Sequence, residues 1–383
     1  MSSFSINRLA TRRRSASAHR TGWALGTALT FTLTLGALTL AAPALAFPQP
    51  TPPNAVVTTI PVGDGAGGVG VDPIRGTVYV ANENYNEGAG TVSVIDERTN
   101  TVRHTITVGS YPYRVVVDPI RGLVYVDNYI SHSVSVINER TNTVIATVAL
   151  PGGSAHDMAI DPYRGLVYLA EGTTVQVISE KTNTVVDSIT MPGNGTDTIG
   201  VDPVRGLVYV GEYYGTLAVI SEKTNTITDT VTTGFNTYLQ AIGVDPATGT
   251  VYVDTYATVG SDQYSGPGAV AVFDERTDTV TKTIPTEANG PSGIAVDPAN
   301  HTLYVTNYDY ESPMTSSVVS VINDRTDSLT TNVPVGVGPA GVAVDPIRGY
   351  AYSANNGPGG STSTPGTVSV IKTSPAFGWW GPW

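Results

Sequence analysis

The sequence of 383 residues contains no cysteine, which excludes disulfides, thiolate metal sites, covalent haem attachment and a lipoprotein anchor. Charged residues are scarce, at 14%, and basic ones are the scarcer kind, with 20 lysines and arginines against 32 aspartates and glutamates. Because binding to a phosphate backbone needs a basic surface, this balance argues against a general affinity for nucleic acid. Helical periodicity is also missing. Glycine (41) and proline (26) are abundant instead, which predicts a chain rich in turns.

The beginning of the chain has the composition of an export segment. Five arginines precede an apolar run from Trp23 to Ala42, and Ala44-Leu45-Ala46 fits the small-x-small pattern of a cleavage site. We therefore expect residues 1–46 to be a signal peptide and residues 47–54 a proline-rich spacer. The protein would then be secreted or associated with the cell surface, with no membrane span in the mature chain. An uncleaved anchor is the alternative, because the apolar run is long enough to cross a bilayer.

The rest of the chain repeats one motif seven times. Each copy begins with an Asp-Pro pair, and an extended run containing tyrosine follows it. An alternating run, a polar turn such as Glu97-Arg98-Thr99-Asn100 and a last extended run complete the copy. Four short strands in a period of 40 to 50 residues are typical of a β-propeller blade. The aspartates of the seven pairs are Asp72, Asp118, Asp161, Asp202, Asp245, Asp297 and Asp345.

The two ends of this array predict a closed ring. Six copies carry their own fourth strand, whereas the seventh ends at Lys372 without one, and the missing pattern stands before the first copy at Ala55 to Gly63. We therefore predict an all-β fold, a seven-bladed β-propeller of residues 55–372 with four antiparallel strands per blade. The N-terminal strand would complete the last blade and protect the sheet edge. Residues 373–383 would form an aromatic tail.

Both repeated turns have a structural explanation. Proline presets φ, the aspartate accepts a backbone amide, and a glycine such as Gly122 supplies the positive φ that leads into the next strand. His301 replaces this glycine in the sixth copy, and we expect Asn300 to take the left-handed conformation there. The repeated tyrosines, such as Tyr125, recur in register and are expected to pack between blades.

The repeats resemble a known family. Tyr304-Val305-Thr306-Asn307 spells a YVTN signature, and Tyr79-Val80-Ala81-Asn82 and Tyr125-Val126-Asp127-Asn128 approach it. The surrounding pattern is similar to the YVTN-type β-propeller repeat from Ala55 to Lys372. This resemblance implies a secreted or surface seven-bladed propeller of prokaryotic type. It implies little about function, because propellers serve binding, scaffolding and catalysis alike.

The strand directions divide the propeller into two faces. The Asp-Pro and Glu-Arg-Thr-Asn turns should share one face, which we call the bottom face, and the remaining loops should form the opposite, top face. The bottom turns are near copies and hold most of the basic residues, whereas the top loops differ from blade to blade and hold acids and tyrosines. We expect this acidic, tyrosine-rich top face to bind a small molecule, a sugar or a basic peptide or protein. A solvated acidic surface that keeps the protein soluble is the alternative.

Alignment of the copies on Asp-Pro places two residues of each blade at the mouth of the central channel. The polar side chains at these positions come from the second to the fifth copy, and we predict that they bind the ligand. They are Tyr113, Arg114, His156, Asp157, Asp197 and Gln240. Carboxylate oxygens of Asp157, Glu171 and Glu212, near the same side, would suit a hard divalent cation as a cofactor.

We expect a monomeric, non-catalytic propeller, since no Gly-x-Ser-x-Gly nucleophile elbow is present. Two alternatives stay open at this point. One is a metal-assisted hydrolase or lyase at the channel mouth. The other is single-strand nucleic-acid binding, which the acidic balance of the chain opposes.

Overall fold

The computed structural model describes residues 52–84, 88–235, 238–256, 267–308, 317–358 and 365–373. All of them belong to the unit Pro50–Trp383. The predicted signal peptide, the start of the spacer and the tail after Thr373 lie outside the described residues. Within those ranges no helix has the length and apolar character needed to span a bilayer.

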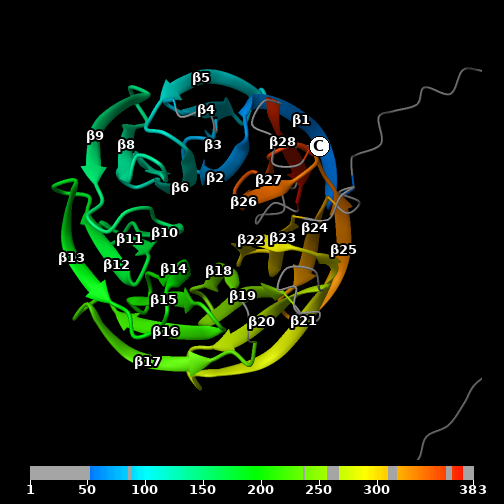
Figure 1. The fold of residues 1–383 in the computed structure, drawn as a ribbon. Coiled ribbons are helices and arrows are strands. Elements are labelled where there is room, and N and C mark those ends of the chain that lie inside the picture. The colour runs from blue at the N-terminus through cyan, green and yellow to red at the C-terminus, as the bar shows by residue number, and fades with distance from the viewer. Residues whose placement is uncertain are drawn as a thin grey trace, which may run out of the picture. The chain divides into compact units, whose positions relative to one another are not determined.

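The described residues form seven four-stranded antiparallel sheets arranged around a central channel (Figure 1). The colour in Figure 1 passes once around the ring, so consecutive blades in space are consecutive in the chain. In each blade the strand that ends in the Asp-Pro aspartate lies innermost, and neighbouring innermost strands contact one another around the channel. The predicted seven-bladed propeller is confirmed.

Six blades consist of four consecutive strands, which follow one another from the channel outward. The first two blades are β2 (Ala66–Asp72), β3 (Thr77–Asn82), β4 (Thr91–Asp96), β5 (Thr101–Thr107), and β6 (Pro112–Asp118), β7 (Leu123–Asn128), β8 (Ser133–Asn138), β9 (Thr143–Ala149). The next two are β10 (Asp157–Asp161), β11 (Leu166–Glu171), β12 (Thr174–Ser179), β13 (Thr184–Thr190), and β14 (Thr196–Asp202), β15 (Leu207–Glu212), β16 (Thr216–Ser221), β17 (Thr226–Thr232). Blades five and six are β18 (Leu239–Asp245), β19 (Thr250–Tyr256), β20 (Pro267–Asp274), β21 (Thr279–Asn289), and β22 (Pro291–Asp297), β23 (Thr302–Asn307), β24 (Val318–Asn323), β25 (Ser328–Pro334).

The seventh blade joins the two ends of the propeller. Its order from the channel outward is β26 (Pro339–Asp345), β27 (Tyr350–Asn355), β28 (Pro365–Lys372) and β1 (Ala55–Asp64). Ala55 pairs with Lys372 and Ile60 with Val368 in an antiparallel register. The predicted closure by the N-terminal strand is therefore confirmed, and Figure 1 shows β1 beside β28 at the edge of the ring.

Each Asp-Pro turn is held by its aspartate. Oδ1 of Asp72 accepts the backbone amides of Ile74 at 2.7 Å and Arg75 at 2.9 Å, and Gly76 ends the turn at φ +66°. The sixth turn corrects one expectation: His301, and not Asn300, carries the positive φ, at +53°. Nδ1 of His301 lies 3.1 Å from Oδ1 of Asp324, and this contact helps to hold the imidazole in place.

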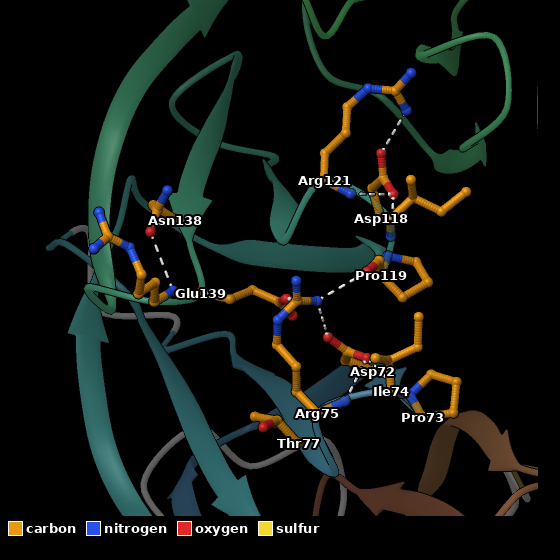
Figure 2. Close-up of polar contacts among 12 residues, drawn as sticks. Asp72, Pro73, Ile74, Arg75, Thr77, Asp118, Pro119, Arg121, Asn138 and Glu139 are labelled. Atoms are coloured by element: carbon orange, nitrogen blue, oxygen red, sulfur yellow. Dashed lines mark hydrogen bonds and ion pairs between the residues drawn. The ribbon is translucent and has the colours of Figure 1, made fainter.

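Arginines of five of these turns connect their blade to the next one on the bottom face. Nη1 of Arg75 lies 2.6 Å from Oδ2 of its own Asp72. The same nitrogen donates to the carbonyl oxygen of Pro119 in the next blade at 2.8 Å and lies 2.9 Å from Oε2 of Glu139 (Figure 2). We call such a group a blade bracket. The arginines of the five blade brackets are Arg75, Arg121, Arg164, Arg205 and Arg348.

Two junctions lack this connection within the described residues. The turns of blades five and six have Thr248 and Asn300 in place of arginine, and their side chains bond to the aspartate of their own turn, each at 2.8 Å. Other hydrogen bonds cross these junctions, from Nζ of Lys282 to the carbonyl oxygen of Thr326 at 3.2 Å and from the hydroxyl of Thr306 to the carbonyl oxygen of Ala340 at 2.8 Å, together with packed side chains.

Tyrosines of the second strands supply much of that packing. Tyr79 and its six counterparts are at most 2% exposed. Tyr79 packs against Val124 and Val126 of the next blade. Burial of one large side chain contributes about 1.5–3 kcal/mol, so seven of them stabilise the ring substantially. The predicted position between blades is confirmed for Tyr79, Tyr125, Tyr168, Tyr209, Tyr252, Tyr304 and Tyr352.

Candidate ligand-binding site on the top face

Irregularities in the innermost strands present side chains to the channel mouth. In the pairing of β6 with β7, Tyr113 and Arg114 lie between the pairs Pro112–Asn128 and Val115–Val126, so two residues oppose one. The same irregularity places Gln240 in β18 and Asp197 in β14. A β-bulge of this kind re-aims side chains at a strand end and commonly lies beside a binding site.

A buried carboxylate of the neighbouring strand β19 supports the bulge in β18. Asp254 stands opposite Gln240 and Ala241 and accepts both of their backbone amides, at 3.1 and 2.5 Å. Burial raises the pKa of Asp254 to about 8, although these amides and the Arg114 charge favour the ionised form. Asp127 has the corresponding place in blade two, where burial raises its pKa well above the ordinary value.

Two adjoining hollows occupy the channel mouth. The larger, which we call the cup, has a volume of about 300 Å³. The side hollow has a volume of about 170 Å³ and shares Tyr111, Tyr113, Arg114 and Gln240 with it. Together the hollows are lined by all seven residues that stand five positions before an Asp-Pro aspartate, as predicted. The cup is lined by Tyr111, Tyr113, Arg114, Tyr129, His156, Asp197 and Gln240.

Aromatic rings form one wall of the cup. The ring centre of Tyr111 lies 6.1 Å from that of Tyr113 and 5.7 Å from that of Tyr129. The imidazole of His156 stacks on Tyr129, with 6.1 Å between centres and 19° between planes. Such a wall offers extended apolar faces together with phenolic hydroxyls.

Arg114 brings a fixed positive charge to the cup. Its Cζ lies 4.6 Å from the ring centre of Tyr113, within the range of a cation–π contact. Its Nε lies 3.2 Å from Oδ1 of Asp157. The other oxygen of Asp157 accepts the hydroxyl of Thr198 at 2.8 Å and the amide of Ile199 at 3.1 Å. Asp157 therefore neutralises and positions Arg114 from the channel below, and it does not line the cup.

The polar side of the cup centres on Asp197. Its Oδ2 accepts the side-chain amide of Gln240 at 3.2 Å, and its Oδ1 lies 4.0 Å from Nδ1 of His156. Burial raises the pKa of Asp197 to about 6, against the opposing effect of the His156 and Arg114 charges. Nδ1 of His156 lies 3.0 Å from the carbonyl oxygen of Thr196. Because a carbonyl only accepts, Nδ1 carries the hydrogen in this bond.

The three carboxylates of the predicted metal site do not converge. Glu171 and Glu212 are at most 2% exposed, and each accepts a backbone amide at 2.9 Å, from Gly152 and Gly193. Among the described residues no cluster of three His, Asp or Glu side chains could hold a metal ion. The two glutamates fasten the loop that enters their own blade, and the expected cation lacks its ligands at this place.

Two residues of the cup are absent from the predicted ligand-binding set. Tyr111 and Tyr129 lie in top-face loops, in register with Gly195 and Tyr213 of blade four, but neither position is one of the two that the alignment on Asp-Pro singles out. Tyr111 adopts φ +55° at a position where blades one, four, six and seven have a glycine of positive φ, so this conformation belongs to the repeat. The sequence signal that could have identified these two residues is the group of three tyrosines at positions 111, 113 and 129.

Comparison with known proteins adds information on the fold. No protein-family model matches the chain. The PE-PGRS family protein PE_PGRS18 of Mycobacterium tuberculosis is 43% identical over 61 residues, which cover 16% of this chain and 12% of that protein. The solved structure of Kuenenia stuttgartiensis hydrazine synthase aligns at a TM-score of 0.66 and 20% identity, over 81% of this chain and 96% of that chain. At this identity the likeness shows the propeller fold alone.

Proposed function

We propose that this protein is an exported, non-catalytic propeller that binds a saccharide in the cup. One observation carries the proposal: three tyrosine rings and four polar side chains converge on a single hollow of about 300 Å³. Small-ligand sites typically have volumes of about 300–1,000 Å³ and combine aromatic walls with a few placed polar groups. The cup has this composition.

The chemistry of the lining favours a sugar among the expected ligands. A tyrosine face can pack against the C–H face of a pyranose, while Gln240, Asp197 and His156 offer donors and acceptors to its hydroxyls. A basic peptide would meet the guanidinium of Arg114 in the same hollow, which disfavours it. Asp197 is the one carboxylate among the described residues that line the cup, whereas glycoside hydrolysis typically uses two, and the predicted metal ligands lie apart, so hydrolase or lyase chemistry has less support.

We also propose that the chain belongs with the YVTN-type propellers. The motif has a physical explanation in β23, where Tyr304 is buried between blades and Nδ2 of Asn307 donates to Oγ of Ser320 at 2.9 Å. Asn82 and Asn355 bond in the same way to Ser93 and Ser369. Export through residues 1–46 remains part of the proposal.

A saccharide array followed by calorimetry tests the function. The chain beginning at Phe47 should retain neutral or amino sugars. Tyr129→Ala should weaken binding of the best one roughly tenfold, which corresponds to about 1.4 kcal/mol of lost stacking. Tyr163→Ala is the matched control, because Tyr163 is 67% exposed in a bottom-face turn. If no saccharide binds, or if Tyr129→Ala binds like the parent, the proposal fails.

A further inference from the structure

The bottom face carries a row of exposed apolar side chains that the turns do not require. The residue after each Asp-Pro pair contributes only its backbone amide to the turn, as Ile74 does to Asp72. In five blades this residue is nevertheless large, apolar and 52–67% exposed. Turns favour Gly, Pro, Asn, Asp and Ser for local reasons, so the recurrence of large apolar residues at this position needs another explanation. The side chains are Ile347, Ile74, Ile120, Tyr163 and Val204.

These five residues stand at the same turn position of consecutive blades on the bottom face, and we call the row the apolar crescent. They belong to blades seven, one, two, three and four, which are neighbours around the ring. Blades five and six have only Ala247 and Ala299 at this position, so the crescent ends there. A row of exposed apolar side chains gathered on one face is a candidate contact site.

Arginines lie between the members of the crescent. The guanidinium of Arg348 donates to the carbonyl oxygen of Pro73 at 2.6 Å, so the turn holding Ile347 directly contacts the turn holding Ile74. A cavity of about 310 Å³, lined by Arg75 and Arg121 among others, lies further along the same face. Guanidinium groups beside apolar side chains suit aromatic rings, above all tryptophan.

The described chain ends at one end of the crescent. β28 runs to the bottom face, and the amide of Thr373 donates to the carbonyl oxygen of Gly349 at 2.9 Å. Gly349 closes the turn that contains Ile347. The next ten residues, 374–383, therefore start beside the crescent. At about 3.3–3.6 Å per residue they can extend beyond the neighbouring blade.

The composition of residues 374–383 complements this surface. The segment contains Phe377, Trp379, Trp380 and Trp383 and no charged residue. Left in water, four such side chains would add to the exposed apolar area, whereas packing on the crescent would remove both surfaces from water.

We propose that residues 374–383 fold back across the bottom face and pack their aromatic rings on the apolar crescent, beginning at Ile347 and Ile74. The segment would then fasten blade seven to blade one, at the junction where the ring closes. This inference is independent of the saccharide site on the opposite face.

Intrinsic tryptophan fluorescence reports on this contact directly. The chain contains four tryptophans, and three of them lie in residues 374–383. The fourth, Trp23, lies in the unit Met1–Gln49 and is absent from a chain that begins at Phe47. We expect the emission of this chain to be shifted to the blue of the free peptide 374–383, with weaker quenching by acrylamide.

Substitution of the crescent then decides the question. Ile74→Ser with Ile347→Ser should shift the emission to the red and strengthen quenching, while Ile145→Ser, at a side chain 51% exposed on the outer strand β9, should change neither. Melting curves verify that the propeller stays folded. Emission equal to that of the free peptide, or unaltered by the double substitution, would overturn the proposal. Two further results would overturn the proposal: a blue shift of the tryptophan emission that appears only when anionic vesicles are added, and a blue shift that is lost when dilution dissociates a dimer.

Discussion

At the scale of single residues, the position of a glutamate along its strand does not by itself determine where its side chain points. Glu171 and Glu212 stand at the top ends of their strands, where alignment of the repeats predicts them. Side chains alternate along a strand, so Glu171 points away from the face on which Tyr168 packs against blade four. It reaches the loop amide of Gly152 and not the channel mouth.

This placement predicts the effect of replacing both glutamates. Glu171→Gln with Glu212→Gln should leave saccharide affinity unchanged, because neither side chain lines the cup. An amide oxygen can still accept the loop amides, so the loss of stability should be about 1 kcal/mol per site or less. Calorimetric titration and thermal melting measure the two quantities. A large loss of affinity with an unchanged melting temperature would restore the carboxylates to the binding site.

The glutamates of the blade brackets make stability depend on pH. Burial and the nearby Asp72 carboxylate raise the pKa of Glu139 to about 8. At Asp72 burial acts to raise the pKa, but hydrogen bonds from Glu139 and Arg75 outweigh it, so the pKa of Asp72 is lowered. In an unfolded chain the glutamate would titrate near 4.5. The folded state thus holds a proton that the unfolded state releases between these values. Burial likewise raises the pKa to about 8 at Glu97, Glu180 and Glu222 and to about 7 at Glu275.

The corresponding contribution to stability is complete below about pH 4.5 and disappears as the pH rises through about 8. We expect the melting temperature to be higher at pH 5 than at pH 9. Glu139→Gln, which is neutral at both values, should narrow this difference, whereas Asp187→Asn at an exposed position should not. A melting temperature that increases from pH 5 to pH 9 would be incompatible with protonated brackets.

At the scale of strands, β1 is the element on which closure of the ring depends. Its side chains are mostly half-exposed, and Ile60 is the deeply buried one, at 2% exposure, packed with Val368 and Val370 of β28. Much of the anchoring of β1 by side chains is therefore concentrated in one residue.

Ile60→Ala should destabilise the protein by about 2–5 kcal/mol, the usual cost of removing a buried aliphatic side chain. Thr59→Ala on the exposed side of the same strand is the control. Removal of residues 52–62 should leave the edge of β28 open and promote aggregation. Chemical denaturation and light scattering follow these effects. A shortened protein that unfolds like the parent and stays monomeric would show that the strand is dispensable.

At the scale of the whole molecule, the repeats determine the ring and the loops determine the site. The Asp-Pro turn and the buried tyrosine are local features repeated seven times, and a single fourth strand stands before the first copy, so the fold and its closure can be predicted from them. Five of the six predicted ligand-binding residues line the cup because a shared register brings them to one rim. Tyr111 and Tyr129 stand at loop positions where the copies differ in residue type, so the register alone does not single them out.

The distribution of blade brackets predicts unequal stability around the ring. Blade six is the one blade with no bracket at either junction among the described residues. We expect β22 to β25 to exchange their amide hydrogens faster than β10 to β13, which have a bracket on both sides. Mass spectrometry of hydrogen exchange measures this, and equal protection of the two blades would contradict it.

The central claim is that the cup at the channel mouth is the binding site. A crystal structure of the protein soaked with the tightest-binding saccharide tests it most directly. We predict a sugar ring packed on the tyrosine wall of Tyr113 and Tyr129, with its hydroxyls bonded to Asp197 and Gln240. A sugar bound elsewhere on the propeller, with the cup unoccupied at saturating concentration, would contradict this account.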